Sequence, residues 1–219
     1  MSKAHSVAHK LSALTHLQCR SFFDIAKRIA KQVQGALPIV GLVSRLVSPE
    51  GGGFEEMAYQ EYTRSMYEKS SSTFTAALLS FETTHGKPAT RKFVLLMLWM
   101  ATTGGGLVPP RDTINAARRL RVTQDIEIEI DRFEMARSVT LEKYNMMARP
   151  EATLQEKVVV AVDTLCVMSL GLKDGVAIPE SEVAVLGAIL QGAFLEATPA
   201  DIALAISSRT QRAATYLLV

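Results

Sequence analysis

Glu82 and His85 stand three residues apart, which is the spacing of the paired ligands in helical di-iron sites. A complete site of that kind needs two such pairs and two further carboxylates. No glutamate stands three residues before any of the other histidines, which are His5, His9 and His16. Because Gly86 follows directly, the sequence favours a histidine in the last turn of a helix, where a basic group complements the helix dipole.

Two further patterns could hold an ion or a phosphate. His5 and His9 are four residues apart, which suits metal binding on a helix, but no acidic or cysteine ligand accompanies them. The triple glycines at 51–53 and 104–106 lack the Gly-Lys-Ser/Thr ending of a phosphate loop and a preceding strand. We interpret both glycine runs as linkers and predict no cofactor or metal site. A helical metal-binding protein stays open as an alternative.

Nucleophilic catalysis needs a serine or cysteine beside a placed base. Cys19 and Cys166 have no catalytic motif around them, no Gly-x-Ser-x-Gly occurs, and three of the four histidines lie in the first sixteen residues. The acids Glu55, Glu56 and Glu61 fit a solvated helix face. The sequence therefore predicts a protein that is not an enzyme and has no catalytic residue. Two lone cysteines also suit a reducing compartment.

The last residues of the sequence raise the question of DNA binding. Two short helices are predicted, at about 199–207 and 210–218, and their residues loosely echo a helix-turn-helix. The turn between them lacks the usual glycine, and Arg209 and Arg212 are few cations for gripping phosphates. A DNA-binding regulator that uses helices 199–218 is the second candidate function, and nucleic acid is the less favoured partner.

One internal segment resembles a known helical family. An apolar helix is followed by a Lys-Asp-Gly-Val turn at 173–176 and by Pro179, and Glu180 and Glu182 open the next helix. In this order, residues 153–191 resemble the TerB-type helical family, in which an acidic cluster can bind metal. The resemblance covers under a fifth of the chain, and we transfer none of that family's metal ligands to it.

The N-terminal 50 residues carry the strongest functional pattern. Residues 1–47 hold seven Lys/Arg against one acid, whereas residues 150–219 hold four against eight. Over about 6–33 the apolar residues recur at helical spacing, with the cations mainly off that stripe. A basic amphipathic helix can lie on an anionic membrane surface or dock into a groove of a protein partner. We expect the contact residues to be Lys10, Arg20, Phe22, Ile25, Lys27, Arg28, Ile29 and Lys31.

The same N-terminal arm allows two alternative roles. Its apolar face can pack on the rest of the chain, or the arm can serve as an organelle-targeting peptide, since it is basic, contains serine and is poor in acids. No compact apolar stretch of a secretory signal follows the first lysines. We predict an intracellular protein, cytoplasmic or organellar, that is not secreted.

The predicted helices are expected to pack around one apolar run of the sequence. Residues 93–100 read Phe-Val-Leu-Leu-Met-Leu-Trp-Met, with Arg91 and Lys92 directly before them. A membrane-spanning helix needs about 20 apolar residues, so this run is too short to cross a bilayer. It is therefore predicted to form a buried central helix that ends at the glycines 104–106, with residues 158–172 as the second buried segment.

Glycine, proline and serine divide the remaining sequence into helices. We expect one or two helices over 54–85, meeting near 70–72, and further helices over 112–120, 153–173 and 179–195.

Residues 122–148 allow two interpretations. Ile126, Ile128 and Ile130 alternate with acids, as in a half-buried strand. The apolar residues also recur at helical spacing, and no turn residue interrupts the segment. A single helix is favoured, although it leaves Ile128 exposed.

The sequence thus predicts an all-α, multi-helix bundle of about eight helices with an amphipathic N-terminal helix. Residues 1–50 would form the arm and 54–219 the helical body, with a further division near 150 left open. The leading functional hypothesis is a non-enzymatic interaction, assembly or scaffold protein, associated peripherally with a membrane or a larger complex. Its partners would be other proteins or further copies of itself, with an anionic membrane surface as a second contact.

Overall fold

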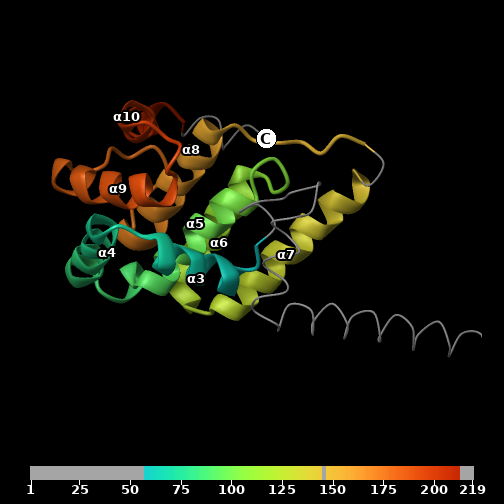
Figure 1. Cartoon of the computed structure of the whole chain (residues 1–219), viewed down its shortest axis with the longest axis horizontal. Helices are drawn as coiled ribbons and strands as arrows, with labels where there is room; N and C mark the ends of the chain where they lie inside the picture. Colours follow the sequence, from blue (N-terminus) through green and yellow to red (C-terminus); the bar gives the residue numbers. More distant parts are fainter. Residues whose placement is uncertain (1–56, 145–146, 213–219) are drawn as a thin grey trace, which may run out of the picture. The chain divides into compact units, whose positions relative to one another are not determined.

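The computed structural model describes residues 57–144 and 147–212 (Figure 1). Over these two ranges the chain forms eight α-helices, a further helical segment at residues 209–212, a 3-10 turn and a π-helical turn, and no β-strand. The prediction of an all-α, multi-helix fold is therefore confirmed. The α-helices are α3 (Tyr59–Lys69), α4 (Ser72–His85), α5 (Arg91–Thr103), α6 (Pro110–Thr123), α7 (Ile126–Lys143), α8 (Leu154–Leu165), α9 (Glu180–Ala193) and α10 (Pro199–Ser207).

The apolar run of the sequence forms α5, the most buried helix described. Every residue from Phe93 to Ala101 is buried, and full burial of a large apolar side chain contributes roughly 1.5–3 kcal/mol. The Trp99 indole N–H donates a hydrogen bond to the Met57 carbonyl at 2.7 Å. None of the described helices is both long and apolar enough to cross a bilayer. The prediction of a core helix is confirmed.

The second central helix is α8, which contacts α5, α6, α9 and α10. Its buried residues include Val158, Val162 and Leu165, which confirms the predicted second core segment. The helix begins at a capping box, in which Thr153 and Glu156 each bond the backbone of the other. After Leu165 it continues as a π-helical turn, Cys166–Leu170, and ends where Gly171 adopts a left-handed conformation. The predicted extension to Lys173 is therefore three residues too long.

The helices α4 and α9 pack tightly against each other. A Cβ atom added at Gly192 of α9 would lie only 2.2 Å from the ring of Phe74 on α4. The absence of a side chain at Gly192 is therefore what allows this close approach. As predicted, the chain breaks between α3 and α4 at Ser70 and Ser71.

The predicted single helix over residues 122–148 is wrong at both ends, since the observed helix is Ile126–Lys143. Gln124 adopts a left-handed conformation with φ 59° and ends α6, so Val122 belongs to α6 and is 81% exposed. The helix α7 starts two residues later, where the Asp125 side chain accepts a hydrogen bond from the Ile128 amide. From there to Lys143 the helix is continuous, so the strand alternative is excluded for this segment. Ile128 is 47% exposed, as the helical interpretation requires.

Candidate partner-binding groove

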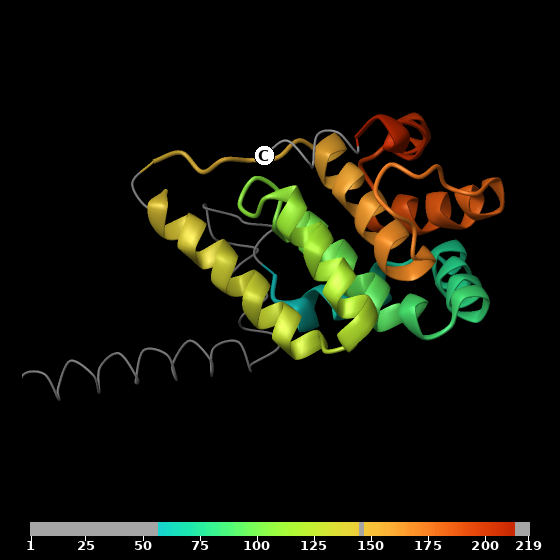
Figure 2. The same cartoon turned by 180° about the vertical axis from the view of Figure 1, so that it is seen from behind.

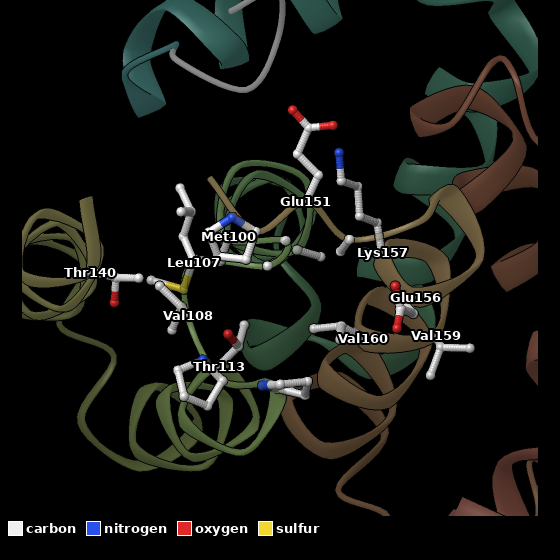
Figure 3. Close-up of a pocket in the computed structure, with 18 of the residues that line it drawn as sticks. Met100, Leu107, Val108, Thr113, Thr140, Glu151, Glu156, Lys157, Val159 and Val160 are labelled. Atoms are coloured by element: carbon white, nitrogen blue, oxygen red, sulfur yellow. The ribbon is translucent and has the colours of Figure 1, made fainter. Parts of the chain in front are cut away.

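A cavity of about 580 Å³ is lined mainly by four parts of the described chain (Figure 3). They are the end of α5 with the loop after it, the beginning of α6, the end of α7, and the first turns of α8 with residues 150–152 before it. Clefts of roughly 300–1,000 Å³ hold small molecules or the side chains of a partner. We call this cavity the groove.

The end of α7 forms one wall of the groove. Its two fully buried residues, Glu129 and Phe133, both lie in the first half of the helix. The Phe133 ring lies 5.0 Å from the Trp99 ring, centroid to centroid, which fixes this half against the core. Towards its end α7 diverges from α5 in both views (Figures 1 and 2), and there Thr140 and Tyr144 line the groove.

The buried side chain of Glu129 links α7 to α6 through an ion pair. Its side chain is only 2% exposed, and its carboxylate accepts two hydrogen bonds from Arg119 of α6, at 2.9 and 2.7 Å. Arg132 donates a third bond, at 3.0 Å. A buried carboxylate needs this many donors, because its charge is otherwise costly to remove from water.

The triple glycine at 104–106 forms the end of the groove. A Cβ atom at Gly105 would lie 2.7 Å from a side-chain carbon of Lys157, and one at Gly106 would lie 2.4 Å from the Pro150 carbonyl oxygen. Gly106 also has φ +79°, which disfavours other residues. The expectation of a linker between helices is correct here. These glycines also let the segment before α8 lie directly against the loop.

Apolar side chains dominate the groove, and they include Met100, Leu107, Val108, Val159 and Val160. Glu156 is held by the α8 cap, where its carboxylate accepts the Thr153 amide at 2.7 Å and the Thr153 hydroxyl at 2.9 Å. These two bonds, the backbone one first, lower the pKa of Glu156. Such a site can bury apolar side chains of a bound segment.

Arg212 reaches the groove from the last described turn of the chain, where Asp163 fixes it. Asp163 is 4% exposed and accepts two hydrogen bonds from Arg212, at 3.0 and 3.1 Å. The Arg209 Nε atom lies 3.3 Å from the same carboxylate, and this side chain also donates to the Lys173 carbonyl at 3.0 Å. Sequence reasoning missed Asp163, although a lone acid inside an apolar helix signals a buried partner.

The same geometry bears on the DNA-binding alternative. Arg209 is 2% exposed and the side chain of Arg212 is 14% exposed, and both guanidinium groups point to Asp163. The two residues expected to grip phosphates are therefore engaged inside the protein. Contact of these two arginines with a nucleic acid would require breaking these ion pairs.

Glu82 and His85 do not converge on a shared site. His85 is the last residue of α4, as predicted, and its Nε2 atom lies 2.8 Å from a carboxylate oxygen of Glu182 on α9. Glu82 instead pairs with Arg91 at 3.3 Å. In residues 57–144 and 147–212, no group of three or more His, Cys, Asp or Glu is arranged to hold a metal ion. Cys166 is buried, which raises the pKa of its thiol to about 12.

A second surface feature lies on the face of α7 turned away from the core. Ile128, Met135 and Val139 are 47%, 63% and 48% exposed, and their spacing of seven and four residues places them on one face of the helix. We call these three residues the α7 outer stripe. Because Ile126, Ile130 and Phe133 face the core, α7 is apolar on both sides. An exposed apolar face of this kind is typical of a protein-binding helix.

The predicted contact residues of the N-terminal arm, Lys10, Arg20, Phe22, Ile25, Lys27, Arg28, Ile29 and Lys31, all lie outside the described residues. Their role therefore stays a prediction, as does the division into an arm and a body.

The helical fold, the apolar groove and the α7 outer stripe define a helical protein suited to binding other proteins. Over 190 residues the chain is 29% identical to the chloroplastic photosystem I assembly factor PSA3 of Zea mays. This alignment covers 85% of this chain and 70% of the relative. The chain is 30% identical over 105 residues to the chloroplast PSA3 of Arabidopsis thaliana, covering 48% of this chain and 38% of that relative. The two similarities confirm the predicted class of function, an assembly or interaction protein.

Two further comparisons found no counterpart. No family model matches the chain, so the resemblance of residues 153–191 to TerB-type proteins gains no support. No solved structure matches it either.

Proposed function

We propose that this chain is a non-enzymatic assembly factor that binds protein subunits of a photosystem I-type complex while the complex is being built. The observation that carries the proposal is the similarity to a photosystem I assembly factor across 85% of the chain. That relative is chloroplastic, and we propose an organellar, chloroplast-type location for this chain as well.

The groove and the α7 outer stripe supply a physical mechanism. A subunit that has not yet met its permanent neighbours exposes apolar surface, and such surface promotes aggregation. Covering it is favourable by roughly 25 cal/mol per Å² of apolar area. Met100, Leu107 and Val160 in the groove can cover part of that surface. Because the groove is open on one side, the subunit can leave when its permanent neighbour binds.

The basic arm, residues 1–50, would provide a second contact. With seven Lys/Arg against one acid in residues 1–47, it would be drawn to an anionic membrane surface near the growing complex. We propose that the arm and the body are separable. Deletion of residues 1–50 would then leave Trp99 buried and the body folded, but would abolish vesicle binding that weakens with added salt. Vesicle binding that survives the deletion would remove the arm from the proposal.

A capture experiment tests the proposed activity. The intact chain is immobilised and exposed to newly synthesised, labelled chloroplast proteins, and the retained proteins are identified. We expect photosystem I subunits to be enriched over photosystem II subunits. The variant Leu107→Arg, which places a charge in the groove, should lose them, whereas Leu79→Arg on the exposed surface of α4 should retain them. Equal capture by the two variants would contradict binding through the groove.

A further inference from the structure

The described chain ends at Arg212, which itself lines the groove. The next seven residues read Ala-Ala-Thr-Tyr-Leu-Leu-Val, positions 213–219. They contain no charged residue, glycine or proline. Four consecutive residues, from Tyr216 to Val219, are large and apolar.

We propose that residues 213–219 occupy the groove of their own chain when no partner is bound, and that a partner segment must displace them. The inference rests on the proposed function for the identity of the partner. The contact within the chain can be measured without any partner.

The anchoring of Arg212 fixes the point from which this segment starts. Its guanidinium group binds both carboxylate oxygens of Asp163 and also donates to the Ala205 carbonyl at 2.7 Å and the Ser208 hydroxyl at 2.6 Å. The chain therefore continues from a fixed point beside the cavity. Seven residues reach at most about 25 Å when fully extended, so the groove lies within reach of the segment.

The chemistry of the groove suits an uncharged occupant. Apolar side chains make up much of its lining, among them Met100, Leu107 and Val159. Two of the charged groups that line it are already held by the fold, Glu156 by Thr153 and Arg212 by Asp163. An apolar segment buries its side chains there without leaving a new charge unpaired, which a charged segment would do.

Because the segment is covalently joined to the protein, it competes effectively with a partner for the groove. A segment joined by a short connection has an effective concentration in roughly the millimolar range. A weak contact within the chain therefore keeps the groove largely filled. The apparent affinity of a partner is then its intrinsic affinity multiplied by the fraction of molecules in which the groove is open. Only partners with a high intrinsic affinity for the groove displace the segment.

A labelled peptide tests the proposal with the full-length chain. The probe is the synthetic heptapeptide Ala-Ala-Thr-Tyr-Leu-Leu-Val with a fluorophore, and its binding is followed by anisotropy. The double variant Leu217→Asp/Leu218→Asp should release the native segment and bind the peptide roughly tenfold more tightly than the unaltered chain. Adding Leu107→Arg should abolish this binding, and adding Leu79→Arg should not. Equal affinity of the unaltered chain and the double variant, or no binding by the folded double variant, would overturn the proposal.

Disulfide trapping provides a second measurement that does not depend on the aspartate variants. In a Cys19→Ser background, Tyr216→Cys is combined either with Leu107→Cys in the groove or with Leu79→Cys outside it. Under mild oxidation we expect an intramolecular disulfide only in the first pair. Equal bridging in both pairs, or none in either, contradicts the proposal. Neither measurement involves photosystem subunits, so a failure here leaves the proposed function standing, and a failure to capture subunits leaves this contact standing.

Discussion

Asp163 on α8 binds the Arg212 guanidinium through both carboxylate oxygens, at 3.0 and 3.1 Å, and so ties the last described turn of the chain to the centre of the fold. Asp163 is 4% exposed, and the Nε atom of Arg209 approaches the same carboxylate at 3.3 Å. The pair therefore joins α8 to the end of the described chain, and it also fixes the position of Arg212 at the groove.

Removing the charge of Asp163 should destabilise the protein severely. Asp163→Asn keeps the size of the side chain but leaves two buried guanidinium groups without their counter-ion, and breaking a buried pair typically costs about 3–5 kcal/mol. Unfolding by urea, followed through the fluorescence of Trp99, measures the change. Glu196→Gln, at an exposed acid, is the control and should match the unaltered chain. A midpoint for Asp163→Asn equal to that of the control would contradict this role.

Glu129 should stabilise the attachment of α7, and its loss should leave the stability of the core unchanged. Glu129→Ala removes the carboxylate that Arg119 and Arg132 bind. We expect the amides of α7 to exchange hydrogen faster, while those of α5 keep their protection, because α5 is buried by other helices. Hydrogen exchange with mass spectrometry resolves the two helices. Glu134→Ala, at an exposed position on the same helix, should change neither, and the prediction is wrong if α5 loosens together with α7.

The α7 outer stripe should matter for binding and not for stability. Met135 is 63% exposed, so Met135→Glu should change the free energy of unfolding by less than about 0.5 kcal/mol. The same change places a charge in the middle of the stripe and should reduce capture of partner proteins. Val122→Glu, at an 81% exposed residue of α6 outside the stripe, is the matched control. Sedimentation of the unaltered chain shows whether a second copy pairs through this stripe; in that case Met135→Glu yields monomers.

Two helix caps should make stability depend on pH. Hydrogen bonds from the Thr153 amide and hydroxyl lower the pKa of Glu156, and those from the Thr198 hydroxyl and amide lower the pKa of Asp201. A carboxyl group whose pKa is lower in the folded state stabilises the fold above its unfolded pKa, near 4, and this contribution is lost as the pH falls through the folded pKa. Glu156→Gln/Asp201→Asn should therefore lower Tm at neutral pH.

The lowering should disappear in strong acid, where both carboxyl groups of the unaltered chain are protonated. Thermal unfolding followed by circular dichroism at neutral pH and at about pH 2 measures the difference. The double variant Glu134→Gln/Glu196→Gln, at exposed acids that cap no helix, should show no such dependence. A Tm difference for the cap variant that stays constant with pH would contradict the assignment.

Local signals in the sequence were sufficient for several helices. The apolar run 93–100 predicted α5 because a helix that is apolar on every side must be buried. The helix predicted at about 199–207 matches α10, which begins at a capping box formed by two neighbours in sequence, Thr198 and Asp201. Gln124 could not be identified as a helix end, since glutamine has no particular preference for the left-handed conformation it adopts.

The groove and its ion pairs could not be predicted from local patterns. Its walls come from residues as far apart as Met100 and Arg212, and only the folded chain brings Gly106 against Pro150. Likewise, Arg209 and Arg212 look like surface cations in the sequence, and their pairing with Asp163 depends on how α10 packs on α8. The class of partner, other proteins, is still further from local patterns and is indicated by similarity across most of the chain.

The most direct test of the assembly function is the level of photosystem I in the source organism after disruption of the gene for this chain. Photosystem I would be measured by its light-induced absorbance change, relative to photosystem II. We predict a selective loss of photosystem I that is restored by the unaltered chain and by Leu79→Arg but not by Leu107→Arg. An unchanged ratio of the two photosystems after disruption of the gene would contradict the account.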